Sequence, residues 1–163
     1  MEENDLEIRT ATTEDVAGIL ACLAAAFEPY RDSYTVSAYL DTVLTAETLT
    51  ERFAAMQVLV AIANCQVVGT IACAQTDAGE GHLRGMAVLP QWQGRGVAGQ
   101  LLRAAEAVLT ERGCRHITLD TTEPLERAMA FYEHHGYRRS GKTTDFFGMA
   151  LHEFVKEVGR SGG

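Results

Sequence analysis

Glycines at three spaced positions, Gly94-x-Gly96-x-x-Gly99, carry the densest chemical signal in the sequence. They follow an apolar, strand-like run and precede an amphipathic helical pattern, so they lie where a loop becomes a helix. The first N–H groups of a helix have no partner within it, and the helix dipole adds partial positive charge there. Because glycine leaves that backbone accessible, the stretch predicts a site for a phosphate or pyrophosphate group.

The same glycines match the dinucleotide-binding pattern G-x-G-x-x-G, and Asp120 ends the next predicted strand, where a ribose-binding acid is expected. The context argues against that function. Pro90 to Gln93 separate the glycines from their strand, whereas dinucleotide-binding glycines follow the strand almost immediately. The unit should also begin its fold, yet a long segment precedes it and too few residues follow Asp120. A dinucleotide-binding oxidoreductase is therefore the less favoured alternative.

Two further blocks flank the glycine loop. The run 83–90, LRGMAVLP, leads directly into it, and the run 128–137, AMAFYEHHGY, follows at a distance that suits one helix and one strand. Within the loop, Gln91, Gly94 and Gly96 form the pattern Gln-x-x-Gly-x-Gly. Together these blocks resemble the GNAT superfamily of acyl-CoA-dependent N-acetyltransferases. For the glycines alone, a plain strand-to-helix turn is the alternative interpretation.

The resemblance implies that acetyl-CoA is the acyl donor, with no metal ion involved. Its pyrophosphate would be held by the backbone amides of the loop and first helical turn, which belong to Gln93, Gly94, Arg95, Gly96, Val97 and Ala98. Its pantetheine arm would pair like a neighbouring strand with the main chain of Met86, Ala87 and Val88. The N–H of Val88 would also face the thioester oxygen as an oxyanion donor.

Acetyl transfer to an amine also needs an acid for the leaving thiolate and a base for the amine. The resemblance places Tyr132 near the coenzyme sulfur and implies that it is the general acid; a buried core tyrosine is the alternative. Relatives often carry a glutamate near the start of the fourth strand, where this sequence has His82, with Glu80 just before it. We expect His82 to be the base because its titration range suits the task. Glu80 and Glu123 are the other candidates, and for each of the three residues a solvated surface side chain is the alternative interpretation.

One position departs from the family pattern. An asparagine is frequent three residues before the alanine of the second block, where this sequence has Leu125. Thr121, Thr122 or Arg127 could replace that contact. The departure leaves a non-catalytic acyl-CoA-binding module as the second alternative function.

The acceptor is expected to be a primary amine of a small molecule or peptide. In the family the acceptor is bound by the amino-terminal helices and the last strands, so the aromatic and charged run 27–34 is a candidate acceptor pocket or an ordinary surface turn. Arg31 could pair with a substrate carboxylate, which would favour an amino acid over a polyamine. The net charge of −8 favours a cationic acceptor instead. The sequence leaves the acceptor open.

The composition limits the remaining function classes. With 22 acidic against 14 basic residues, the surface should repel phosphate backbones and anionic lipids, so neither nucleic acid nor a membrane is an expected partner. No apolar run reaches the roughly 18 residues of a membrane span, and no secretory signal is apparent. The four cysteines lack metal-site or disulfide spacing and are expected to be buried free thiols. We therefore expect a cytoplasmic protein.

The elements that must position these residues follow from periodicity and punctuation. A first helix should begin at Thr12-x-x-Asp15 and close at Pro29, and one further helix is expected within 30–55, where Thr48-x-x-Glu51 resembles a capping box. The later elements are predicted as strands 58–63 and 67–74 in a hairpin, strand 83–89, helix 97–112, strand 116–121, helix 127–135 and strand pattern within 137–158, including Phe147.

The resemblance implies that these elements form a fold of the mixed α/β (α+β) class. It implies a mostly antiparallel sheet of six or seven strands flanked by about four helices, the GNAT acyl-CoA N-acyltransferase fold. The strands 83–89 and 116–121 should run parallel and diverge to admit the pantetheine arm. A single domain is expected over residues 1–163, with 159–163 as a frayed tail, and homodimers are frequent among relatives.

Overall fold

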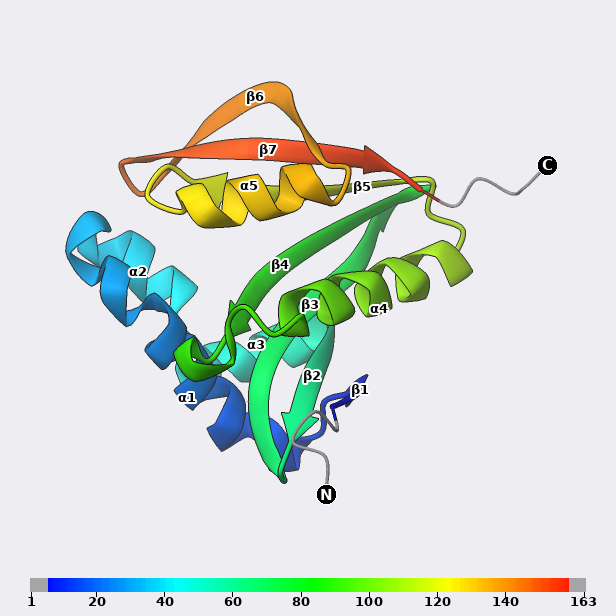
Figure 1. The fold of residues 1–163 in the computed structure, drawn as a ribbon. Coiled ribbons are helices and arrows are strands. Elements are labelled where there is room, and N and C mark those ends of the chain that lie inside the picture. The colour runs from blue at the N-terminus through cyan, green and yellow to red at the C-terminus, as the bar shows by residue number, and fades with distance from the viewer. Residues whose placement is uncertain (1–5, 159–163) are drawn as a thin grey trace.

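The computed structural model describes residues 6–158, which are built around one seven-stranded sheet (Figure 1). Its order is β1-β2-β3-β4-β5-β7-β6, and only β4 and β5 are parallel. The strands are β1 (Glu7–Thr10), β2 (Gln57–Ala63), β3 (Gln66–Asp77), β4 (Glu80–Val88), β5 (His116–Thr122), β6 (Arg138–Phe146) and β7 (Met149–Glu157). The predicted mostly antiparallel sheet is confirmed, and its topology is incompatible with a doubly wound dinucleotide-binding fold.

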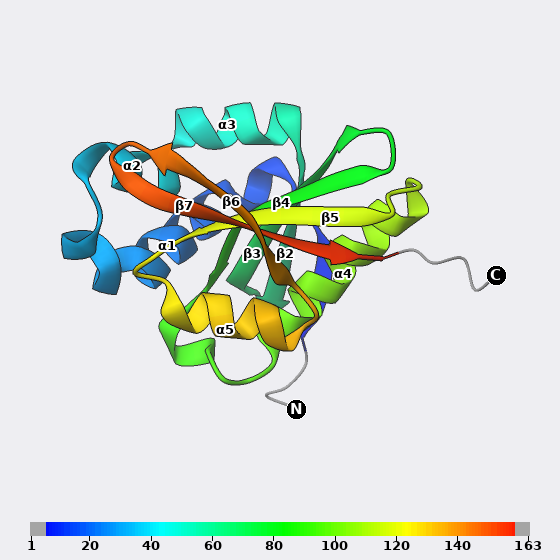
Figure 2. The ribbon, with the colours of Figure 1, turned by 90° about the horizontal axis from the view of Figure 1, so that it is seen from above.

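Helices cover both faces of the sheet. They are α1 (Val16–Phe27), α2 (Val36–Thr42), α3 (Ala46–Ala55), α4 (Val97–Glu111) and α5 (Glu126–His134). Seen from above, α1, α2 and α3 lie on one side of the strands and α4 and α5 on the other (Figure 2). No helix within residues 6–158 is both long and apolar enough to cross a bilayer. The predicted frayed tail, 159–163, lies outside the described residues.

The segment 30–55 holds two α-helices where the sequence predicted one. Each begins at a threonine whose side-chain oxygen accepts a backbone N–H, because Thr35 caps α2 through Ala38 and Thr45 caps α3 through Thr48. The predicted capping box at Thr48 was therefore wrong, since the box is formed by Thr45 and Thr48 one turn earlier. Helix α1 likewise ends at Phe27, before the predicted closure at Pro29, and a 3-10 helix continues from Glu28 to Ser33.

The β2–β3 hairpin is confirmed. Its turn places Asn64 and Cys65 at φ of 52° and 63°, the left-handed region required at both central positions of a tight I′-type turn. Cys65 is consequently exposed, whereas the other three cysteines are buried free thiols as expected. Phe147 does not continue a strand, because it lies in the β6–β7 turn at φ 52°.

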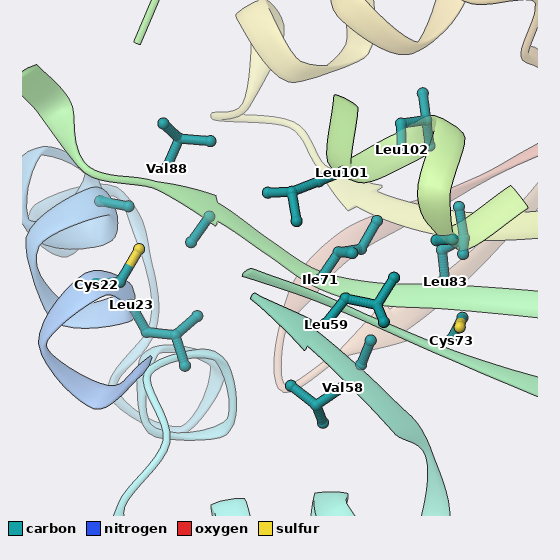
Figure 3. Close-up of a cluster of buried hydrophobic side chains, with 14 of the residues drawn as sticks. Cys22, Leu23, Val58, Leu59, Ile71, Cys73, Leu83, Val88, Leu101 and Leu102 are labelled. Carbon is teal, nitrogen blue, oxygen red and sulfur yellow. The ribbon is translucent and has the colours of Figure 1, made fainter. Parts of the chain in front are cut away.

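The core is formed by α1 and α4 packed against opposite faces of the central strands. Figure 3 shows Cys22 and Leu23 of α1 on one flank and Leu101 and Leu102 of α4 on the other. Gly69 on β3 permits the close approach of α4, because a Cβ there would lie 2.8 Å from Leu101 Cδ1. This contact sets the height of α4, and therefore of the loop that precedes it, above the sheet.

Gly69→Ala should destabilise the protein by about 1–3 kcal/mol, because the new methyl group overpacks the contact between β3 and α4. Leu101→Ala alone should cost about 2–5 kcal/mol by leaving a cavity. The double variant should lose less than the sum, since the truncated side chain makes room for the methyl group. Urea unfolding of all four proteins measures this coupling, and strict additivity would contradict the packing described.

Candidate active site

Strands β4 and β5 pair over four residues only and then diverge. Glu80–Leu83 pair with His116–Leu119, and beyond them both strands continue without hydrogen-bonding to each other. A bulge opens in β4 at the same place, where its register to β3 jumps between Arg84 and Ala87, and Gly85 adopts φ of +71°. A cavity of about 510 Å³ occupies the gap and is lined from both strands and from α1, α3 and α5.

The free edge of β4 forms one wall of this cavity. Met86, Ala87 and Val88 all line it. In the register of β3 and β4, Gly69 and Val88 are a pair without mutual hydrogen bonds, so the Val88 N–H points away from β3 and toward the gap. Its C=O accepts a 3.0 Å hydrogen bond from Gln93 Nε2, which ties the glycine loop to the strand. The edge therefore offers a backbone donor at the point of divergence.

Helix α4 begins without a side-chain cap. Its N-cap is Gly96 at φ 85°, and its first turn contains no acidic residue. The first intrahelical bond is from Gln100 N to Gly96 O, at 3.1 Å, so the N–H groups of Val97, Ala98 and Gly99 precede the helical ladder. In helices α2 and α3, by contrast, a threonine side chain accepts a hydrogen bond from one of the first N–H groups. An uncapped positive helix end beside a cavity is suited to an anion.

The remaining loop residues shape the approach to that end. Gly94 also has positive φ, at 80°, and a Cβ at Gly94 or Gly96 would meet no atom within 4 Å. Of the predicted pyrophosphate ligands, Gln93 and Ala98 line the cavity itself. The Arg95 guanidinium lies 4.8 Å over the Trp92 ring, which keeps its charge close to the loop.

Tyr132 on α5 reaches the cavity from the side of α4 and α5. Its side chain is buried, and burial raises its pKa above the ordinary value, so the phenol stays protonated. Within the described residues its hydroxyl makes no hydrogen bond, whereas Tyr34 is bonded to Thr122 and Tyr137 donates to Glu106. Of the two buried tyrosines that line the cavity, Tyr34 and Tyr132, it is therefore Tyr132 whose proton is free to be donated.

His82 enters the cavity from the opposite face of the sheet. Its Nδ1 lies 2.7 Å from Thr118 Oγ1, and that hydroxyl lies 3.4 Å from the carbonyl of Gly81. If the hydroxyl donates to the carbonyl, His82 carries its proton on Nδ1 and leaves Nε2 unprotonated. Nε2 is 3.7 Å from Asp120 Oδ2, which is too long for a hydrogen bond and leaves space for a third group.

The electrostatics of this pair suit proton acceptance. Burial lowers the pKa of His82, and the nearby Asp120 carboxylate only partly opposes that shift. Burial also raises the pKa of Asp120, with His82 opposing. At neutral pH the imidazole is therefore neutral and can accept a proton. Asp120 is a site residue that the sequence suggested only as the ribose-binding acid of the disfavoured dinucleotide-binding alternative, and its position at the end of a strand was the signal available.

The other two candidates for the general base do not line the cavity. Glu80 is the first residue of β4 and does not line the cavity, and Glu123 is exposed and pairs with His152 at 3.2 Å. Leu125 does line the cavity. Beside it, Thr121 Oγ1 is buried without a hydrogen-bond partner among the described residues, so Thr121 is the free polar group where the asparagine is missing.

The predicted acceptor segment contributes to the cavity in part. Phe27, Tyr30 and Tyr34 line it. Arg31 does not, because it pairs with Glu28 at 3.4 Å and its guanidinium lies over the Tyr39 ring. No cluster of three or more metal-ligating side chains occurs within residues 6–158.

A sheet that diverges beside an uncapped helix defines an acyl-CoA-binding class of fold, and comparison with known proteins agrees. The model of the acetyltransferase (GNAT) family matches residues 20–137, so the chain belongs to that family. It is 34% identical over 84 residues to N-alpha-acetyltransferase 30 of Schizosaccharomyces pombe, covering 49% of this chain and 56% of the relative. It is 29% identical over 83 residues to N-alpha-acetyltransferase MAK3 of Arabidopsis thaliana, covering 49% and 44%. The chain thus spans about half the length of these curated relatives.

Solved structures show the same fold at low sequence identity. PaiA N-acetyltransferase from Thermoplasma acidophilum, solved in complex with coenzyme A, aligns with a TM-score of 0.78 at 18% identity, covering 94% of this chain and 99% of that one. The ribosomal-protein-S18-alanine N-acetyltransferase from Escherichia coli aligns at 0.77 and 16% identity, covering 96% of both chains. The predicted fold class and superfamily are confirmed.

NMR titration of the imidazole should give His82 a pKa below its ordinary value of 6.5. Asp120→Asn should lower it further, because the variant removes a negative charge that favours the imidazolium. Glu80→Gln is a matched control and should move the pKa in the same direction by less, since its influence is the weakest of those acting on the ring. A rise in Asp120→Asn would contradict the described geometry.

Proposed function

We propose that the protein transfers the acetyl group of acetyl-CoA to a primary amine of a small molecule or peptide, by direct attack of the amine on the thioester. The observation that carries this proposal is the divergence of β4 and β5 beside the uncapped start of α4. The N–H groups there suit the pyrophosphate, and the free edge of β4 suits the amides of the pantetheine arm. Membership of the GNAT family supports the same donor.

The acceptor amine and the leaving thiolate are served by residues on opposite faces of the sheet. The acceptor amine enters on the side of α1, α2 and α3, where Nε2 of His82 takes its proton and Asp120 holds the positive charge that develops. The amine nitrogen bonds to the thioester carbon, whose oxygen accepts a hydrogen bond from the Val88 N–H. The carbon–sulfur bond then breaks, and Tyr132 donates its phenolic proton to the departing thiolate.

Thr121 has a supporting place in this scheme. Strand alternation puts Leu119 and Thr121 on the face toward α4 and α5, opposite to Thr118, Asp120 and Thr122. Its unpartnered hydroxyl therefore faces the donor side of the gap, where the family's asparagine is replaced by Leu125. We infer that Thr121 supplies the polar contact to the pantetheine arm. A non-catalytic acyl-CoA-binding module remains the competing function, favoured by Leu125.

The acceptor class is supported from two directions. The curated relatives are named N-alpha-acetyltransferases, which favours the amino terminus of a peptide. The wall formed by Phe27, Tyr30 and Tyr34 is aromatic, which suits the first side chain of such a peptide as well as a small amine.

Acetyl-CoA should raise the melting temperature, because it binds the native state only, and NAD should leave it unchanged. At a ligand concentration of about 100 times the dissociation constant, the stabilisation amounts to about 2.7 kcal/mol. Differential scanning fluorimetry with acetyl-CoA, CoA and NAD measures this. Stabilisation by NAD alone would overturn the proposed donor.

Tyr132→Phe should lower kcat for acetyl transfer about 100-fold or more while changing the KM for acetyl-CoA by no more than about twofold, since only the donated proton is lost. Thiol release with a panel of amines measures both constants. Tyr137→Phe is the matched control, because its hydroxyl bonds Glu106 away from the cavity and its loss should lower stability rather than kcat. Unchanged turnover in Tyr132→Phe would remove the assignment.

A further inference from the structure

Arg52 brings an unmatched positive charge into the acceptor side of the cavity. It projects from α3 and lines the gap together with His82 and Asp120. Its guanidinium lies against the bulge of β4, because Gly85 has no side chain, and a Cβ there would be 2.5 Å from Nη1. Burial, with Arg84 adding to it, lowers the pKa of Arg52 to about 10. Such a group remains charged at neutral pH, and partial desolvation makes that charge costly.

The neighbouring charged groups are already engaged. Asp41 of α2 accepts a hydrogen bond of 3.3 Å from Arg84, and Asp120 faces His82. Arg52 makes no ion pair and no side-chain hydrogen bond with any residue in the range 6–158 that the structure describes. Among the described residues of this face, Arg52 is therefore a cation that no carboxylate contacts, although Asp41 partly opposes the lowering of its pKa.

We propose that Arg52 binds a carboxylate of the acceptor, so that the substrates are amines that carry a carboxylate close to the amino group. This inference rests on the proposed acetyl transfer and specifies its acceptor. A guanidinium presents paired N–H donors whose spacing matches the two oxygens of a carboxylate. A carboxylate would compensate the desolvated charge while the amine of the same molecule lies at Nε2 of His82.

A second hollow offers space for an acceptor longer than a single amino acid. It has a volume of about 480 Å³ and adjoins the first, sharing Asp41, Arg52 and Arg84 as its boundary. Its outer rim includes Leu40 and Phe147, which are 62% and 52% exposed. The carboxylate at Arg52 can therefore be the α-carboxylate of a free amino acid or an acidic side chain near the amino terminus of a peptide.

The overall charge of −8 does not exclude an anionic acceptor. Surface charges are screened over about 8–10 Å at physiological ionic strength, whereas a partly buried guanidinium acts at contact distance. At the same short range, the Asp120 carboxylate that lines the cavity attracts the ammonium group of the acceptor. A zwitterionic acceptor meets both conditions.

The test compares acceptors that differ only in one carboxylate. Free amino acids are paired with their carboxamides, and peptides with Asp or Glu in the first three positions are paired with their Asn or Gln counterparts. The wild type should show a KM about tenfold lower for the carboxylate member of at least one series, as expected for one charged hydrogen-bonded pair. The series that shows the preference identifies the source of the carboxylate.

Arg52→Gln should abolish that preference by raising KM for the carboxylate member, with kcat and the KM for acetyl-CoA unchanged. Arg52→Lys should restore part of it, because the charge returns without the paired donors. Arg31→Gln, which alters an exposed arginine outside the cavity, should retain it in full. Melting temperatures with acetyl-CoA confirm that each variant is folded and binds the donor.

The outcomes distinguish a failure of the role of Arg52 from a failure of the proposed acetyl transfer. Equal kinetics within every pair, or a preference that survives Arg52→Gln or disappears in Arg31→Gln, overturns the role of Arg52 and leaves acetyl transfer intact. Absence of thiol release with every acceptor, acidic and neutral, overturns the proposed function and this inference with it.

Discussion

Strands β4 and β5 are hydrogen-bonded between Glu80–Leu83 and His116–Leu119, and the interruption of that ladder is the constraint on which the site depends. If pairing continued, β5 would take up the Val88 N–H and the cavity would close. The bulge at Gly85 lies just beyond Leu83, the last residue of β4 that pairs with β5. A parallel pair tolerates this divergence because β3 and β7 hold the outer edges of both strands.

Because β4 and β5 diverge, the cavity between them is reached from both faces of the sheet. Side chains alternate across a strand, so His82 and Arg84 face α1, α2 and α3, while the α5 side receives Tyr132. Acid and base can therefore act on one substrate pair from opposite sides without neutralising each other. The sheet also separates two charged regions. The positive end of α4 lies on the donor side, and His82, Asp120 and Arg52 lie on the acceptor side.

Stability and function make opposing demands at the start of α4. A side-chain cap would stabilise the helix by about 1 kcal/mol, but it would occupy N–H groups that an anion needs, and the φ of 85° at Gly96 disfavours the threonine or aspartate that could supply it. Gly96 leaves them available. The helix is held instead by its buried face, in which Leu101, Leu102 and Leu109 are fully buried. Packing in the middle of a 15-residue helix thus permits an uncapped end.

What the sequence alone determined was local in character: the hairpin turn at 64–66, the glycine loop before α4, and the alternating or helical periods of most elements. Those features depend on neighbours a few residues away. The sequence did not predict which side chains come together where segments distant in the chain meet. Asp120 was considered only for a disfavoured ribose site, Arg31 and not Arg52 was considered for a substrate carboxylate, and one helix was predicted in 30–55, where two threonine caps begin two helices. Only the tertiary structure brings His82 beside Asp120 and Arg52 against Gly85, because strand register, a bulge and helix packing decide which side chains share a cavity.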